Sequence, residues 1–143
     1  VFMAVNSPTA SLATTLTAPS LGFPVSSGVP YQFQYRLPWR VTVGTTGLKV
    51  GVTFPAHISC AISVAVPVAV PGTAAFFEGQ ISRSGTMITG TTAPTLNDNI
   101  AIIDGMIYLS GSGMLNVIYA AEVSAPTGPY FKAGANGIIW ALA

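Results

Sequence analysis

The chain has 143 residues, a length that predicts a single domain spanning residues 1–143. Only 6% of its residues are charged, five Lys/Arg against four Asp/Glu, and 50% are hydrophobic, whereas about a quarter of a typical soluble domain is charged. So few cations argue against a nucleic-acid partner, and so little charge favours an obligate oligomer, because wide apolar patches promote association.

Short β-rich runs separated by Gly, Pro, Asn and Ser clusters occur along the whole chain, and no long stretch has the apolar spacing of a helix. The pattern predicts strands at residues 11–17, 30–37, 47–54, 57–66, 74–83, 86–91, 99–109, 114–123 and 137–142. About nine short strands in one domain favour an all-β, antiparallel two-sheet sandwich, and a jelly roll above other topologies.

The second predicted strand has a clear alternation, YQFQYRLPWR at residues 31–40. Its large apolar side chains, which we expect in the core, are Tyr31, Phe33, Tyr35, Leu37 and Trp39. An aromatic platform for nucleic acid or sugar is the less favoured interpretation, since only three cations lie near. Pro38 lacks an N–H and is predicted to end the ladder. Trp39 and Arg40 would then lie beyond it, and Trp39 could face either its own core or a neighbouring subunit.

The later strands are apolar on both faces. In MLNVIYAAEV, residues 114–123, the odd positions form one apolar face, but Ile118 and Ala120 make the other face apolar too. In NIAIIDGMIYL, residues 99–109, Gly105 within the apolar run predicts a β-bulge. Such strands suggest that one face fills the sandwich and the other meets a neighbouring subunit.

Two uncharged segments resemble membrane segments only in hydropathy. Residues 1–35 lack the basic start and the continuous apolar run of a signal peptide. Residues 58–77 are long enough to span a bilayer, but Pro67, Pro71 and Gly72 interrupt them. We therefore expect no membrane insertion.

Groups suited to catalysis are scarce. His57 is the only histidine and Cys60 the only cysteine, and positions three apart in one strand face opposite sides, which argues against a thiol catalytic pair or a His/Cys metal site. Asp98 and Asp104 fit turns better than paired acid–base chemistry, although a cation at the Asp98 loop is an alternative. We expect no enzyme, no cofactor and no metal site.

The segment FPVSSGVPYQFQYRLPWRVTVGTTGLKVGVTFPA, residues 23–56, resembles a domain that recurs in tailed-bacteriophage virion proteins. The shared features are a Tyr-x-Phe-x-Tyr-x-Leu strand at 31–37, a Thr-rich loop ending in Thr-Gly-Leu at 46–48, and a strand closing on Pro55 and Ala56. The segment 102–123 and the closing AGANGIIWALA at 133–143 are also similar. This resemblance covers most of the chain. It implies a jelly roll similar to tumour-necrosis-factor and C1q heads, assembled as a homotrimer.

The resemblance further implies a structural virion protein, assembled in the host cytoplasm. Because the sequence shows no helical or repetitive shaft, we expect a capsid decoration (cement) protein that binds the major capsid protein. The alternative is a tail-fibre head domain that recognises a host cell-surface glycan through the aromatic side chains of Trp39, Tyr130 and Phe131. A third reading, a pilus-like self-assembling protein, would need the uncharged N-terminal segment as a donor strand. The residues that we expect at a subunit interface are Trp39, Arg40, Tyr130, Phe131 and Trp140.

Overall fold

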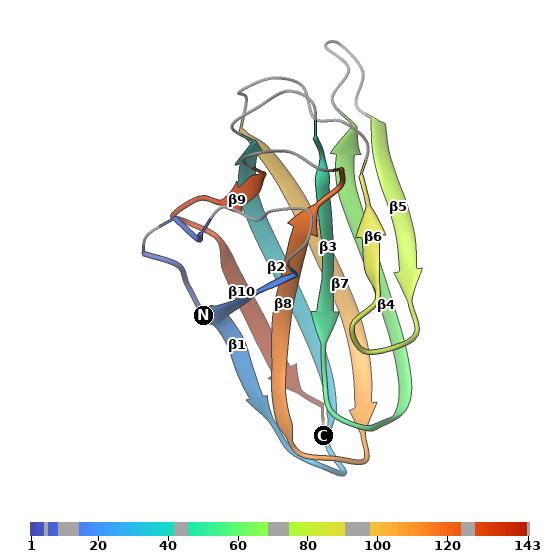
Figure 1. The fold of residues 1–143 in the computed structure, drawn as a ribbon. Helices are drawn as coiled ribbons and strands as arrows, with labels where there is room; N and C mark the ends of the chain where they lie inside the picture. The colour runs from blue at the N-terminus through green and yellow to red at the C-terminus, as the bar shows by residue number, and fades with distance from the viewer. Residues whose placement is uncertain are drawn as a thin grey trace.

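A computed structural model describes residues 1–4, 6–8, 15–41, 46–68, 75–90, 98–123 and 128–142. It confirms the predicted all-β chain with two antiparallel sheets (Figure 1). The strands are β1 Leu16–Val25, β2 Pro30–Val41, β3 Leu48–Thr53, β4 His57–Val68, β5 Ala75–Ile81, β6 Met87–Thr89, β7 Asn99–Leu109, β8 Gly113–Ala121, β9 Pro129–Phe131 and β10 Asn136–Ala141. Within the described ranges, no helix is long and apolar enough to cross a membrane.

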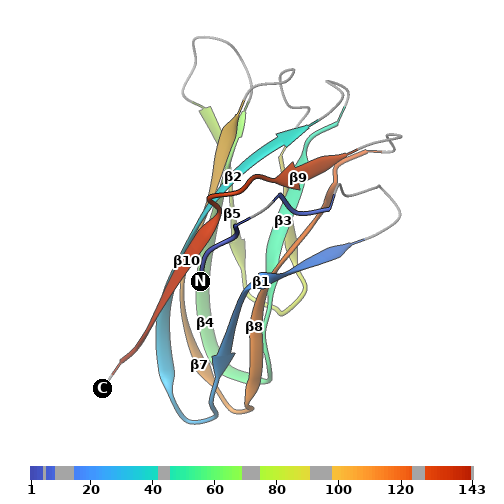
Figure 2. The same cartoon turned by 90° about the vertical axis from the view of Figure 1, so that its left-hand side faces the viewer.

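The two sheets differ in size. The smaller sheet has four strands in the order β1-β8-β3-β6, and the larger has the order β10-β2-β7-β4-β5, with β9 also paired to β2. From β1 to β8, consecutive strands alternate between the sheets, except that β4 pairs directly with β5. Figure 2 shows β1 and β8 on one side of the molecule and β4 and β7 on the other. This arrangement is consistent with the predicted sandwich.

One hydrophobic core lies between the sheets, and the odd positions of β2 point into it, as their alternation predicts. Tyr35 and Leu37 are fully buried, and the Tyr35 hydroxyl donates a hydrogen bond to the Leu21 carbonyl at 2.9 Å. The largest fully buried side chains are Trp39, Tyr35, Tyr119, Phe33, Phe131, Leu21, Leu37, Leu48, Ile62, Ile81, Ile103 and Leu109. Trp39 therefore faces the core of its own chain.

The prediction that Pro38 ends the ladder is wrong, because β2 continues to Val41 and pairs with β7 as far as Trp39. The Pro38 carbonyl accepts a hydrogen bond from the Lys132 N–H at 2.9 Å. The polar backbone groups of Pro38 thus face β9 and β10 rather than β7. Its missing N–H falls at the break between these two short strands, where it removes no bond of the β2–β7 ladder.

Two edge strands differ from their prediction. Residues 11–14 of the strand predicted at 11–17 lie outside the described part of the chain, and β1 instead extends to Val25. Pro24 would be expected to interrupt a strand, but Pro is tolerated in an edge strand such as β1. The pairing of β1 with β8 shifts its register between Ala18 and Phe23. No strand was expected at β9, since three residues are too few to show alternation.

The structure also corrects two expectations about single residues and faces. Gly105 is not a bulge, because β7 pairs across it in unbroken register with Phe33 and Ile62. A Cβ atom there would lie 2.6 Å from the Phe33 ring, so glycine leaves room for that ring. Ile118 and Ala120, expected on a face that meets a neighbour, are each only 4% exposed within the chain itself.

Candidate functional site

The outer face of the larger sheet is formed by the side chains that alternate with the core residues of each strand. Strand register arranges these side chains in rows across the sheet. One row contains Trp140, Gln32, Met106 and Ala61, and the next contains Ile138, Gln34, Asp104, Ser63 and Gln80. Residues from β10, β2, β7, β4 and β5 therefore meet on one surface.

A hollow of about 490 Å³, which we call the amide hollow, opens on this face. The side chains that give it its chemical character are Gln32, Gln34, Ser63, Gln80, Asp104 and Trp140. Its depth comes from β4, whose outward side chains Ala61 and Ser63 are small, while Met106 and Gln80 on the neighbouring strands are larger. The amide hollow is thus a depression in which several polar side chains lie among apolar ones, with Trp140 as an aromatic member of its lining.

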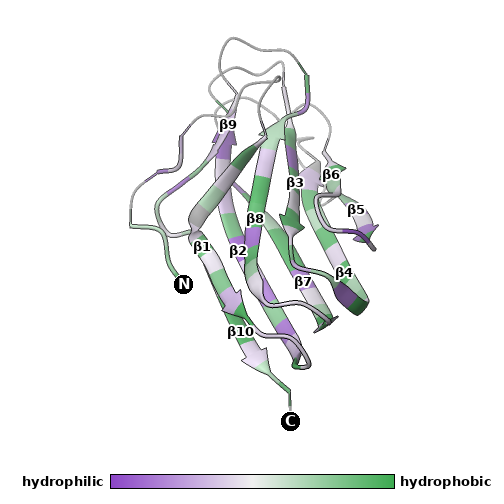
Figure 3. Cartoon of the chain, turned by 60° about the horizontal axis from the view of Figure 1, so that its bottom comes forward, coloured by the Kyte–Doolittle hydropathy of each residue, from purple (hydrophilic) through white to green (hydrophobic). Residues whose placement is uncertain are grey.

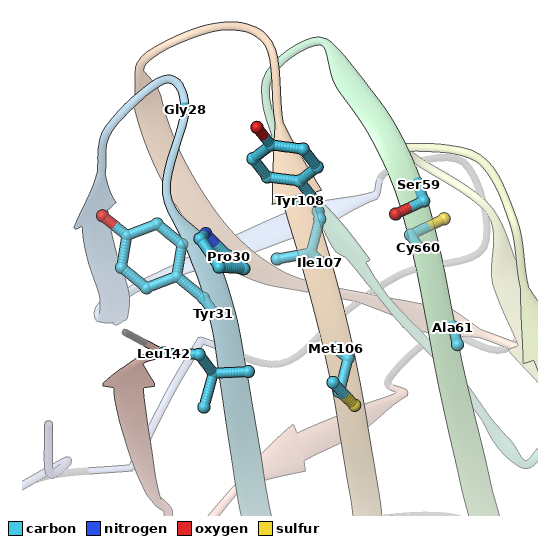
Figure 4. Close-up of a pocket in the computed structure, with 10 residues that line it drawn as sticks. All are labelled: Gly28, Pro30, Tyr31, Ser59, Cys60, Ala61, Met106, Ile107, Tyr108 and Leu142. Atoms are coloured by element: carbon cyan, nitrogen blue, oxygen red, sulfur yellow. The ribbon is translucent and has the colours of Figure 1, made fainter.

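A second hollow of about 450 Å³, the tyrosine hollow, lies next to it and shares Ala61 and Met106. Figure 4 shows Tyr31 on β2 and Tyr108 on β7, with Cys60 on β4. The Tyr31 hydroxyl accepts a hydrogen bond from the Ser26 N–H at 3.0 Å, which holds its ring in place. The two hollows are therefore neighbours on this face, with Ala61 and Met106 lining both.

One hydrogen bond within the amide hollow orients its polar groups. Gln34 Nε2 donates to Asp104 Oδ1 at 2.6 Å, across the β2–β7 pair. The bond uses one of the two amide N–H donors of Gln34 and leaves its carbonyl oxygen free to accept. Trp140, by contrast, presents an exposed surface, since it is 46% exposed.

The five residues predicted at a subunit interface divide into two groups. Trp39 and Phe131 are fully buried in the chain's own core, and the Phe131 ring packs against Tyr119 with centroids 4.6 Å apart. Neither side chain offers surface to a partner, because each is enclosed by its own sandwich. The other three keep exposed surface: Arg40 and Tyr130 form a partly exposed cross-strand pair, and Trp140 is exposed on β10. The interface itself stays a prediction.

The residues weighed for catalysis or metal binding have structural surroundings. His57 packs edge-on against the Phe54 ring, with centroids 5.1 Å apart, and burial raises the pKa of the Cys60 thiol, which weakens it as a nucleophile. Asp98 forms an ion pair with Lys132. Among the described residues, no three His, Cys, Asp or Glu side chains are grouped so that they could hold a metal ion.

Sequence reasoning missed the polar residues of the amide hollow. Alternation along β2 does place Gln32 and Gln34 on the outer face. It carries no information about which residues of β4, β5 and β10 lie beside them, because strand order and register are set by contacts distant in sequence. Gln80, Ser63 and Trp140 could therefore not be grouped from the sequence.

Comparison with known proteins adds no family to this description. No protein-family model matches the sequence, and no curated protein matches it. The function of the chain is accordingly inferred from its surface chemistry, its strand order and the resemblance described above.

Proposed function

We propose that this chain is a structural protein of a bacteriophage virion, a jelly roll that assembles as a homotrimer and decorates the capsid as a cement protein. The strand order supports the jelly roll, because β1-β8-β3-β6 lies opposite β2-β7-β4-β5 and the strands alternate between the sheets. The virion role rests on the resemblance of residues 23–56 to phage virion domains.

The observation that carries self-assembly is the surface left by a single chain. The large apolar side chains exposed among the described residues are Val1, Phe2, Ile58, Phe76, Ile100, Met106, Tyr108, Met114, Val123, Ile138 and Trp140. The whole sequence has only five Lys/Arg and four Asp/Glu to keep such a surface solvated. Apolar area on this scale favours association with further copies.

The distribution of charge indicates which sheet is the assembly face. Lys49 is the only charged residue within the strands of the smaller sheet, whereas the strands of the larger sheet carry Arg36, Arg40, Glu78 and Asp104. Figure 3 shows β8 largely green, with few hydrophilic positions. Burying an ion costs several kcal/mol. Contact through the outer face of the smaller sheet, around Met114, would therefore bury the fewest ions, although most of the exposed apolar side chains lie on the larger sheet.

The N-terminal segment bears on the pilus-like alternative. The Met3 N–H donates to the Ala135 carbonyl at 2.8 Å, and the Gly137 N–H donates to the Val1 carbonyl at 3.0 Å. Residues 1–3 are thus paired with residues 134–137 of the same chain, at the start of β10 and in the turn before it. A segment paired in this way is not available as a donor strand for another subunit, which favours a closed trimer over a filament.

The proposal is tested by the mass of the purified protein together with its position on labelled virions. We expect a trimer at micromolar concentration and label at three-fold or quasi-three-fold positions of the capsid. A monomer at that concentration would contradict the assembly. Label confined to the tail would contradict the capsid role and support the tail-fibre alternative.

A further inference from the structure

We propose that the amide hollow is a binding site for a neutral oligosaccharide, with Trp140 as its stacking surface and Gln32, Gln34 and Gln80 as its hydrogen-bonding groups. This activity goes beyond the proposed structural role. It places the sugar on the outer face of the larger sheet, opposite the face that we assign to subunit assembly.

The dimensions of the site suit a ligand of this kind. Its volume of about 490 Å³ lies within the roughly 300–1,000 Å³ range of small-molecule sites. Small residues line its centre on β7 and β4, namely Gly105, Ala61 and Ser63, whereas Trp140 lies on the edge strand β10 and Gln80 on β5. Trp140 and Gln80 are thus at opposite ends of the strand order, so a chain of sugars rather than a single ring would reach both.

The polar groups match sugar hydroxyls rather than ions. Each glutamine amide supplies both donors and an acceptor, and each sugar hydroxyl is itself a donor and an acceptor. Gln32, Gln34 and Gln80 reach the hollow from β2 and β5, on opposite sides of the small residues on β7 and β4. Adjacent hydroxyls on a ring can therefore be bound in pairs by planar side chains.

The site is also partly ordered before any ligand binds. The 2.6 Å bond from Gln34 to Asp104 fixes the Gln34 amide and leaves its oxygen and one N–H for the ligand. Ordering a side chain in advance lowers the entropy cost of binding. The bound carboxylate of Asp104 also disfavours acidic sugars, because like charges repel.

The exposed indole supplies the second half of the recognition. Trp140 is 46% exposed and is the direct cross-strand neighbour of Gln32. The apolar C–H face of a pyranose ring packs on an indole while its hydroxyls point sideways. A cross-strand Trp–Gln pair thus combines a stacking surface with an amide at the edge of the same ring.

The neighbouring tyrosine hollow extends the site. It shares Met106 and Ala61 with the amide hollow and adds the exposed ring of Tyr108. A second sugar ring joined to the first can lie there, along the direction of β4. The ligand class that fits both hollows is therefore an oligosaccharide of neutral sugars.

The test uses the intact protein on an array of neutral hexose and N-acetylhexosamine oligosaccharides, with sialylated versions for comparison. Titration calorimetry with the best neutral binder follows, on the wild type and on Trp140→Ala, Gln34→Ala and Ile138→Ala. Ile138 is the matched control, because it is exposed on the same strand but lies outside both hollows. Thermal melting and native mass are measured for every variant.

We expect binding to neutral sugars, weakened at least tenfold by Trp140→Ala and by Gln34→Ala and unchanged by Ile138→Ala, with melting and mass preserved. The absence of binding to any neutral sugar at millimolar concentration would overturn the proposal. So would binding that Trp140→Ala leaves intact. Loss of the oligomer in Trp140→Ala would also overturn it, since this face would then be covered by another copy.

Discussion

Replacing Trp39 tests whether β2 stabilises the fold of one chain or the contact between chains. Trp39 is fully buried, and truncation of a buried Trp to Ala costs roughly 3–5 kcal/mol through lost burial and the cavity that remains. We therefore expect Trp39→Ala to lower the free energy of unfolding by about this amount. Trp140→Ala, at a half-exposed position, should lower it by less than about 1 kcal/mol.

A Trp39→Phe variant separates packing from hydrogen bonding at the same position. The Trp39 Nε1 is a buried donor that has no hydrogen-bond partner among the described residues, and such a group costs about 1–3 kcal/mol. Phenylalanine removes this unpaired donor while it keeps an aromatic ring in the core. The gain offsets most of the lost area, so we expect Trp39→Phe to change the free energy of unfolding by only about 1 kcal/mol in either direction.

The assay is urea-induced unfolding followed by circular dichroism, with all variants at the same protein concentration because subunit association contributes to apparent stability. Native mass is measured alongside. The reasoning would be refuted if Trp39→Ala kept the wild-type unfolding midpoint and lost only the oligomer. That result would place Trp39 at a subunit boundary rather than in the core.

Three further predictions concern assembly, packing and pH. Met114→Arg should dissociate the oligomer at micromolar concentration, because it places a charge on the face that we expect to be buried; native mass reports it. Gly105→Ala should lower the free energy of unfolding by about 1–3 kcal/mol, since its Cβ would clash with the Phe33 ring. Burial raises the pKa values of Tyr35 and Tyr119 above the ordinary value of 10.0. The stability that their neutral forms provide is therefore complete below pH 10 and is lost as the pH rises further. Melting temperatures measured above pH 10 test this.

Each of these has a matched control. Ile100→Arg, on the outer face of the larger sheet, should leave the oligomer intact, and dissociation by both variants would contradict the choice of assembly face. Gly111→Ala should be tolerated, because a Cβ there meets its nearest neighbour at an ordinary 3.4 Å. Tyr35→Phe should reduce the loss of melting temperature above pH 10. An equal loss in this variant would contradict the role of its phenol.

The sequence predicted the fold class well, because alternation within one strand is local information. The odd positions of β2 face the core as expected, and the strand at residues 99–109 has the predicted bounds. Local sequence patterns failed where a neighbouring strand or the opposite sheet determines the structure of a residue. Pro38 stays inside β2 because its missing N–H faces a break in the adjacent strands, and Trp39 is buried because the second sheet covers it. Neither the pairing at Pro38 nor the burial of Trp39 can be predicted from the residues beside them in the sequence.

The candidate site was less predictable than the fold for the same reason. The aromatic residues expected to bind sugar were Trp39, Tyr130 and Phe131, and two of them are fully buried in the core. The amides of the hollow are unremarkable polar residues on separate strands. They become a site only once β10, β2, β7, β4 and β5 lie side by side in one register.

The most direct test of the central claim is the native mass of the protein at micromolar concentration, measured for the wild type and Met114→Arg. We predict three copies of the 14.7-kDa chain for the wild type and a single copy for the variant. A wild-type protein that has the mass of one chain would contradict the claim that it works by assembly.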